Sequence, residues 1–217
     1  MILKAENIQK SYDDLSILKG IDLEINQNEI VSIIGASGAG KTTLLQILGT
    51  LDKPTEGSLS IAGINPFTLN EKELSSFRNS ALGFIFQFHQ LLPEFTACEN
   101  IMLPSLIKGI NKKEAKEQAL ELLINVGLED RAKHKPSELS GGEQQRVAVC
   151  RALINKPKII FGDEPSGNLD TQSSRDLHEL FFKLRDDFNQ TFVLVTHNKE
   201  LSAMADRALT MVDGKFV

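Results

Sequence analysis

The stretch Gly35-Ala36-Ser37-Gly38-Ala39-Gly40-Lys41-Thr42 decides the fold of this chain. It matches G-x-x-x-x-G-K-[ST], the pattern of a loop that binds the phosphates of nucleoside triphosphates. An apolar run typical of a buried strand, 30–34, precedes it, and a leucine-rich stretch that predicts a helix, 43–51, follows it. Strand, glycine-rich loop and helix in this order is the context that the motif requires. The alternative, an ordinary glycine-rich turn before a helix, is much less favoured.

The residue types in this loop suit phosphate chemistry. Glycines lack Cβ, so the backbone can approach an anion closely, and its successive N–H groups can point inward at the positive end of the helix dipole. We expect the backbone of residues 38–43, which includes Thr43, to hold the phosphates. Lys41 adds a mobile cation, and Thr42 adds a hydroxyl suited to Mg²⁺.

The bulk properties exclude several classes of protein. The chain has 217 residues, enough for one large domain or two small ones, and its net charge of −5 argues against nucleic acid as the main partner. The two cysteines, Cys98 and Cys150, are far apart and show no metal-ligand spacing, which indicates a reducing compartment. No apolar run approaches the roughly 20 residues that span a bilayer, and the N-terminus lacks a signal-peptide core. We therefore expect a soluble, cytoplasmic protein that meets a membrane only through a partner.

Strand and helix patterns alternate along the chain, which predicts an α/β fold with a mostly parallel sheet. The first 30 residues alternate as strands do, and 70–73 opens a helix in the manner of a capping box. The middle third reads as an all-helical insertion. Further elements are expected as strands at 58–62, 82–86, 158–161 and 191–196, helices at 112–127 and 142–155, an amphipathic helix before the strand at 191, and a hairpin near 208–214.

Two carboxylates, Asp163 and Glu164, end the apolar strand that begins at Lys158. Open α/β sheets bind their ligands at this end of the strands. Asp163 suits Mg²⁺, which prefers oxygen ligands, and Glu164 is placed to orient and deprotonate a water that attacks a γ-phosphate. The alternative is a solvated strand end, which the neighbouring phosphate loop makes unfavourable.

Other polar residues are ambiguous when each is read by itself. Gln87 and His197 each follow a strand, where a satisfied polar residue is common, although a neutral imidazole can also donate to a phosphate oxygen. Tyr12 lies in a loop and could stack on a purine, but exposed loop tyrosines are frequent. A cluster of lysines reads as a solvated helix face rather than a lipid-headgroup site; it comprises Lys108, Lys112, Lys113 and Lys116.

A second candidate anion site begins the helix at 142–155. In Leu139-Ser-Gly-Gly-Glu-Gln-Gln-Arg146, Ser140 and Gly141 stand at the helix cap, where free N–H groups and the helix dipole face an anion. A bare Ser-Gly-Gly favours an ordinary N-cap, whereas the full run favours a phosphate-facing element.

Together these segments resemble the nucleotide-binding subunit of an ABC ATPase, over essentially the whole chain. The run 139–146 resembles the ABC signature, 35–42 the Walker A loop, 159–164 Walker B, and 166–170 the D-loop. Within that family, 83–104 is similar to the ATPases of the lipoprotein-releasing Lol system, and macrolide-exporter and FtsE-type ATPases share parts of it. Gly162, Cys150 and Ser166 depart mildly from the family pattern, and none of them removes a functional side chain.

The resemblance implies a P-loop, RecA-like core with an N-terminal antiparallel β-region, over about 1–87 and 155–217, and an inserted helical subdomain over about 88–154. It implies a homodimer on ATP binding, with each ATP between the Walker A loop of one protomer and the signature helix of the other. Tyr12 would stack on adenine, Gln87 would serve as the Q-loop residue, and His197 would contact the γ-phosphate. Thr42, Gln87 and Asp163 would hold Mg²⁺, and Glu164 would act as general base. The signature residues in trans would be Ser140, Gly141, Gly142 and Glu143, with Asp170 of the D-loop coupling the two sites.

The resemblance further implies an ATPase that powers a separate membrane permease, in lipoprotein release or related export. The protein would be peripheral on the inner face of the cell membrane through that permease. The alternative is an FtsE-like regulatory ATPase that signals through a membrane partner without transport. The sequence names neither the transported molecule nor the permease.

Overall fold

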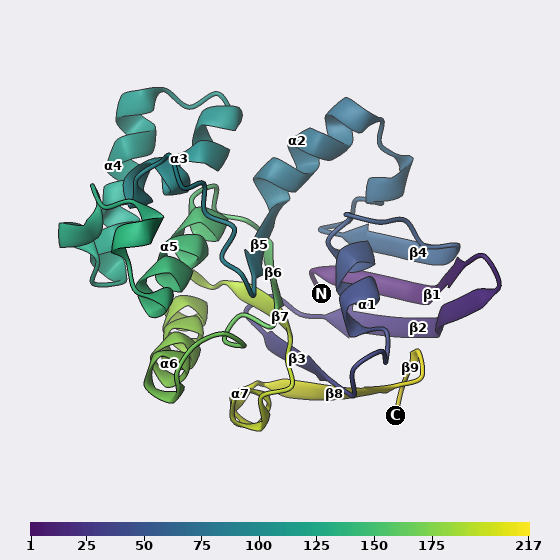
Figure 1. The fold of residues 1–217 in the computed structure, drawn as a ribbon. Coiled ribbons are helices and arrows are strands. Elements are labelled where there is room, and N and C mark those ends of the chain that lie inside the picture. The colour runs from purple at the N-terminus through teal and green to yellow at the C-terminus, as the bar shows by residue number, and fades with distance from the viewer.

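A six-stranded, mostly parallel sheet forms the centre of the molecule, and the computed structural model describes all 217 residues (Figure 1). The strand order is β5–β6–β7–β3–β8–β9, and of these pairs only β8–β9 is antiparallel. The carboxyl ends of the five parallel strands therefore share one edge, where open α/β sheets bind ligands. The strands are β3 (Ile30–Ile34), β5 (Leu82–Phe86), β6 (Ile159–Asp163), β7 (Thr191–Val195), β8 (Arg207–Val212) and β9 (Lys215–Phe216).

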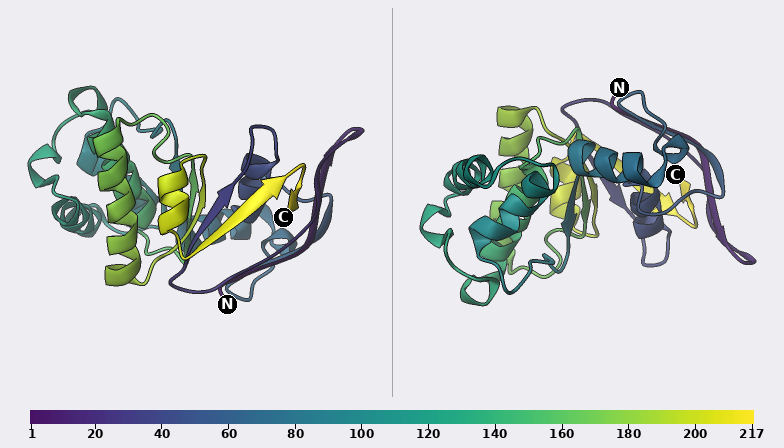
Figure 2. Two further views of the ribbon diagram at one scale, coloured as in Figure 1. Left: turned by 90° about the horizontal axis from the view of Figure 1, so that it is seen from below. Right: turned by 90° about the horizontal axis from the view of Figure 1, so that it is seen from above.

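A second, antiparallel sheet contains β1 (Leu3–Tyr12), β2 (Leu15–Ile25) and β4 (Glu56–Ile61) in the order β2–β1–β4. Apolar residues alternate with exposed ones along much of β2, so one face of this sheet is buried and the other faces solvent. Both views in Figure 2 place this sheet at the side of the molecule opposite to the teal helices.

Seven α-helices and three short 3₁₀ turns complete the fold. The helices are α1 (Lys41–Leu48), α2 (Glu71–Ala81), α3 (Ala97–Ile107), α4 (Lys112–Asn125), α5 (Gly141–Leu153), α6 (Thr171–Phe188) and α7 (Lys199–Met204). The 3₁₀ turns are Pro66–Thr68, Glu129–Arg131 and Pro136–Glu138. We refer to α3, α4 and the chain up to the start of α5 as the helical region. None of the helices is long and apolar enough to cross a lipid bilayer.

Side chains fix the starts of most helices. The predicted capping box at α2 is present: Glu73 N donates to Asn70 Oδ1 at 3.0 Å, and Asn70 N donates to Glu73 Oε2 at 3.0 Å. Thr96 begins α3 with the same reciprocal pair. Such caps satisfy N–H groups that have no partner within the helix, and each contributes about 1 kcal/mol. Only α1 begins without a side-chain cap.

Three apolar clusters hold the layers together. The first lies between the two sheets around α1 and contains Leu44 and Ile47. The second covers the other face of the parallel sheet, where Phe181 of α6 packs on Phe192 of β7 with ring centroids 5.3 Å apart. The third fills the helical region around Ile101. Because the parallel sheet is covered on both faces, its strands are almost entirely apolar.

Most of the expected elements are present, with shifted ends. The strand at 82–86 and the hairpin near 208–214 are confirmed. The helix expected at 43–51 begins earlier, at Lys41, and ends at Leu48, because Gly49 follows and Thr50 takes a left-handed conformation with φ 61°. The sequence predicts helices in the middle third of the chain, but its pattern does not reveal α3 as a separate element.

Candidate functional site

The phosphate loop connects β3 to α1. Gly40 is the N-cap of α1 and has φ 100°, a conformation that side-chain-bearing residues rarely adopt, which explains the glycine. Since no side chain caps α1, the N–H groups of its first turn remain available to an anion. The loop and the helix start thus form the anion-binding surface that the sequence predicts.

Lys41 folds back over this loop. Its Nζ donates to Gly35 O and to Ala36 O, each at 2.9 Å. The two hydrogen bonds hold the cation above the loop backbone, beside the first turn of α1. The side chain of Ala39, by contrast, is buried in the core, so Ala39 offers the site only its backbone.

The end of β6 faces the start of α1. Thr42 Oγ1 donates to Asp163 Oδ1 at 3.3 Å. Burial raises the pKa of the Asp163 carboxyl, the Thr42 hydrogen bond opposes the rise, and the charge of Glu164 adds to it. A carboxylate whose charged form is disfavoured gains stability from a cation nearby. Thr42 and Asp163 are therefore suitable oxygen ligands for a hard cation.

Glu164 follows β6 directly and contacts the end of β7. Its backbone N donates to Val195 O at 2.9 Å, and its φ of 47° is unfavourable for a residue with a side chain. Glu164 Oε2 lies 2.9 Å from His197 Nδ1 and accepts a hydrogen bond from His197 N at 3.2 Å. The parallel pairing of β6 with β7 brings these two strand ends together.

A cavity of about 540 Å³ collects these groups at the carboxyl edge of the sheet. Its volume falls within the range of ligand sites. The cavity receives Lys41 from the phosphate loop, Glu164 from β6 and His197 from β7. The complete lining is Ile17, Gly35, Ser37, Gly38, Gly40, Lys41, Thr42, Thr43, Gln87, Asp163, Glu164, Val195 and His197.

Gln87 joins this cavity from the end of β5 and also contacts the D-loop. Its Nε2 donates to Asn168 Oδ1 at 3.0 Å, and Asn168 Nδ2 donates to Gln87 O at 3.3 Å. Gln87 is predicted from the sequence as a site residue, whereas Asn168 is not, since an asparagine in a loop carries no distinguishing signal.

Tyr12 does not line the cavity. It lies at the end of β1, its side chain is about half exposed, and its hydroxyl donates to Asp52 Oδ2 at 2.7 Å. Lys10 Nζ lies 4.8 Å from the centroid of the ring. One edge of Tyr12 is thus fixed by Asp52.

The signature segment lies at the start of α5, outside this cavity. Ser140 caps α5: Glu143 N donates to Ser140 Oγ at 3.2 Å, and Ser140 N donates to Glu143 Oε2 at 2.7 Å. The Arg131 hydrogen bond at 2.9 Å and that cap lower the pKa of Glu143 to about 2. Ser140 and Gly141 are exposed, so the helix start is accessible from outside the protomer.

The D-loop residue Asp170 caps α6. Its Oδ1 accepts from Ser173 N at 2.9 Å, and its Oδ2 accepts from Ser173 Oγ at 2.6 Å. The chain between Glu164 and Asp170 therefore runs from a strand end to a fixed helix start.

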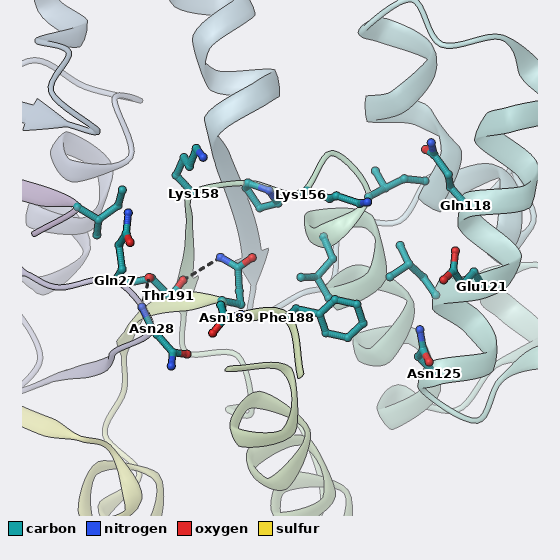
Figure 3. Close-up of a pocket in the computed structure, with 16 residues that line it drawn as sticks. Gln27, Asn28, Gln118, Glu121, Asn125, Lys156, Lys158, Phe188, Asn189 and Thr191 are labelled. Carbon is teal, nitrogen blue, oxygen red and sulfur yellow. Dashed lines mark hydrogen bonds between the residues drawn. The ribbon is translucent and has the colours of Figure 1, made fainter. Parts of the chain in front are cut away.

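Another cavity, of about 550 Å³, lies at the opposite end of the strands (Figure 3). Asn28 precedes β3, Lys158 precedes β6 and Thr191 begins β7, so these residues mark the amino edge of the parallel sheet. Glu121 of α4 and Phe188 of α6 also line it. Since α/β sheets bind ligands at the carboxyl edge, this cavity is not the phosphate site, although its volume is similar.

Comparison with known proteins identifies the family. Residues 18–167 match the family described as ABC transporter. The chain is 62% identical over 213 residues to the lipoprotein-releasing system ATP-binding protein LolD of Bacteroides thetaiotaomicron, covering 98% of each chain. It is 53% identical to the LolD of Aquifex aeolicus, covering all of this chain and 96% of that one.

Solved structures agree in fold. The dimeric ATP-binding cassette MJ0796, in a post-hydrolysis state bound to ADP and phosphate, superposes with a TM-score of 0.90 at 40% identity, covering 99% of this chain and 96% of that one. The cbiO1 protein of Clostridium perfringens superposes with a TM-score of 0.91 at 25% identity, covering 100% and 86%. The predicted α/β fold, with its antiparallel N-terminal sheet and helical region, is confirmed. The chain belongs to the ABC transporter family of ATPases, and within it to the group of LolD.

Proposed function

We propose a division of roles among the residues of this chain, which is the ATPase subunit of a lipoprotein-releasing ABC system. The observation that carries it is the convergence of the phosphate loop, Asp163, Glu164 and His197 on one cavity. The backbone N–H groups of residues 38–43, together with Lys41, bind the phosphates of ATP. The uncapped start of α1 supports this role, because no side chain competes there with an anion.

Glu164 acts as general base. It orients a water and takes its proton while the water oxygen attacks the γ-phosphorus; the bond from that phosphorus to the bridging oxygen breaks, and ADP leaves with the bond electrons. The contact with His197 supports this role, because it fixes Glu164 at the cavity. His197 lines the same cavity, where we propose that it contacts the γ-phosphate.

Thr42, Asp163 and Gln87 are the proposed residues for Mg²⁺. Their oxygen donors line one cavity, and no group of three or more His, Cys, Asp or Glu side chains offers a separate metal site. This set fits an ion that is shared with substrate phosphates rather than caged by protein. Mg²⁺ bound there would neutralise phosphate charge.

The active form is a homodimer in which Ser140 and Gly142 of one protomer close over the ATP of the other, and Asp170 couples the two sites. The exposure of Ser140 and Gly141, which lie outside the ATP cavity of their own protomer, supports this arrangement; Gly142, the next residue, is buried. The dimeric state of MJ0796 supports it as well. Two surfaces rich in N–H groups would then enclose the triphosphate and stabilise the charge that develops on transfer.

A permease docks in a groove between the core and a helical subdomain, to which we assign residues 88–154. A cavity of about 500 Å³ lies there, lined among others by Arg78, Gln90, Ile107 and Arg151. Ile107 is 75% exposed and Phe88 is 73% exposed. Ile107 lies in the groove itself, and a large exposed apolar side chain beside a groove favours a protein interface. The chain would thus lie at the inner face of the cell membrane through its partner.

Reconstitution tests the proposal. The chain is combined in liposomes with the permease that co-purifies with it, and release of a labelled lipoprotein to a soluble acceptor is measured with and without ATP. Release that needs ATP and stops with Glu164→Gln supports the proposal. ATP hydrolysis coupled to the permease without any release favours the regulatory alternative instead.

A further inference from the structure

A buried histidine of α6 contacts the loop that follows Glu164. His178 is 1% exposed and Ser166 is 6% exposed. His178 Nε2 lies 3.0 Å from Ser166 Oγ. Ser166 stands two residues after Glu164, and His178 lies about two turns into α6. The contact therefore connects α6 to the loop that begins just after the proposed base, Glu164.

The hydrogen-bond partners define the state of the imidazole. His178 Nδ1 is buried and has no partner. A proton on Nδ1 would leave a buried N–H without an acceptor, and orphaned buried N–H groups are rarer than unpaired acceptors. A cation would add the cost of a buried charge, and burial indeed lowers the pKa of His178. We assign the proton to Nε2, so that a neutral His178 donates to Ser166 Oγ.

The loop needs such an anchor. Glu164 has a left-handed φ of 47°, which persists only where the surroundings fix it. Gly167 N donates to Glu164 O at 3.0 Å, and Gln145 Nε2 donates to Pro165 O at 2.6 Å. The first bond closes a turn within the loop, and the second holds the loop on α5.

On its other side the loop borders an open, mostly polar pocket. This pocket, of about 230 Å³, is lined by Glu164, Ser166, Gly167 and His197, among others. Few apolar side chains line it, so polar contacts have to hold this side of the loop. Two side chains of α6 supply them at Ser166: His178 Nε2 lies 3.0 Å from its Oγ, and Ser174 Oγ donates to its backbone O at 3.4 Å.

We propose that His178 is a positioning residue for ATP hydrolysis: through Ser166 it fixes the segment Glu164–Asp170, and with it the carboxylate that activates water. The inference rests on the proposed role of Glu164. It predicts a loss in the chemical step rather than in ATP binding, since His178 does not line the cavity of the phosphate loop.

Three variants of the full-length chain test this. His178→Leu fills a similar volume but cannot donate, whereas His178→Gln carries an amide Nε2 at a similar reach. Ser166→Ala removes the acceptor and leaves His178 in place. The matched control is Leu184→Val, a buried α6 substitution remote from the loop. Steady-state kcat, KM for ATP and thermal midpoint are measured for each.

We expect His178→Leu and Ser166→Ala each to lower kcat roughly tenfold, because small misplacements of a reacting group cost that much or more, with KM within about twofold. The double variant with both His178→Leu and Ser166→Ala should lower kcat no more than either single variant does. His178→Gln should keep most of the wild-type kcat. Leu184→Val lowers the thermal midpoint while kcat stays unchanged.

The proposal is overturned if His178→Leu lowers the thermal midpoint as the control does and leaves kcat intact. It is also overturned if the two losses add. If His178→Leu does not fold, Ser166→Ala and His178→Gln test the proposal instead. An unchanged kcat in Ser166→Ala would refute the positioning role of His178. Glu164→Gln, assayed in parallel, separates the two ideas. If Glu164→Gln retains turnover, Glu164 is not the base. If Glu164→Gln loses turnover while Ser166→Ala and His178→Leu stay fully active, only the role of His178 is contradicted.

Discussion

His197 and Glu164 form a hydrogen-bonded pair in which Nδ1 lies 2.9 Å from Oε2. The backbone N of His197 donates to the same oxygen at 3.2 Å. Both contacts fall on Oε2, so Oε1 stays available to a water. The pair places a fixed carboxylate beside the phosphate loop.

Glu164→Gln should reduce ATP hydrolysis by about 10²–10⁴-fold, because the amide cannot accept the proton of the attacking water. ATP binding should persist, since the phosphate loop is untouched, and ATP-bound dimers should accumulate. Phosphate release and size-exclusion chromatography with ATP measure the two effects. The control Glu179→Gln changes an exposed carboxylate of α6 and should behave as wild type. Turnover above a tenth of the wild-type rate in Glu164→Gln would argue against a general base at this position.

Two substitutions at Tyr12 distinguish a stacking role of its ring from the hydrogen bond of its hydroxyl. Tyr12→Ala should raise the Kd for ATP at least about fivefold if the ring stacks on adenine, because base stacking on an aromatic ring contributes roughly 1–3 kcal/mol and about 1.4 kcal/mol is a factor of ten. Tyr12→Phe keeps the ring and loses only the bond to Asp52, at a cost of about 0.5–1 kcal/mol in unfolding free energy. Titration with a fluorescent ATP analogue and chemical denaturation report the two quantities. Equal affinities for all three proteins would exclude a stacking role.

The docking groove should be separable from catalysis. Ile107→Asp places a charge on an apolar side chain that is 75% exposed, so it should abolish co-purification with the permease and leave the ATPase rate of the isolated chain unchanged. Ile124→Asp is the matched control, because Ile124 of α4 is 61% exposed and lies outside the groove lining. Loss of co-purification in both variants would point to a general surface effect.

Glu143, at the start of the signature helix, should make the stability of the fold fall at acid pH. The pKa of Glu143 is about 2 in the folded chain and 4.5 ordinarily, so its ion pair and cap stabilise the fold fully above pH 4.5. That contribution is lost as the pH falls from 4.5 towards 2. Glu143→Gln keeps an oxygen for the cap but loses the charge pair with Arg131. The difference in thermal midpoint between the two proteins should be constant near neutrality and shrink below pH 4.5; a difference that does not change with pH would contradict the assignment.

The second apolar cluster predicts a large stability effect. Phe181 is fully buried against Phe192, so Phe181→Ala should cost about 3–5 kcal/mol in unfolding free energy. Phe188, on the same helix, is 46% exposed, and Phe188→Ala should change the unfolding free energy by about 0.5 kcal/mol or less. Urea denaturation compares the two variants. Similar losses would mean that α6 packs differently from the arrangement described.

The sequence predicts the fold well where chemistry restricts the choice of residues. The phosphate loop requires glycines and a lysine at fixed spacing, and the strand that ends at Asp163 is an apolar run closed by charges. Such patterns predicted the strands that meet at the cavity, and the family resemblance supplied the roles of Gln87 and His197. Glu143 was identified with the signature, but its partner Arg131 was not, because twelve residues separate them and only the fold joins them.

Other features leave no local signal. Helix α3 is almost entirely apolar and packs between α4 and α5, so it lacks the polar face that reveals most helices, and Pro104 interrupts its pattern. The contact of His178 with Ser166 joins a helix to a loop across the core. Helical spacing does place His178 on the buried face of α6 with Leu177 and Phe181, but it does not reveal that Ser166 is its partner.

Helix α5 has one mechanical consequence. Its thirteen residues make a rod about 20 Å long, with Ser140 at one end and Arg151 near the other. Arg151 donates to the carbonyls of His89 and Gln90, and Asn155, just past the helix, donates to Pro104 O. These contacts lie at the permease groove. Because α5 is a single uninterrupted helix, a displacement of its first turn along the helix axis would carry over to the proposed docking groove about 20 Å away.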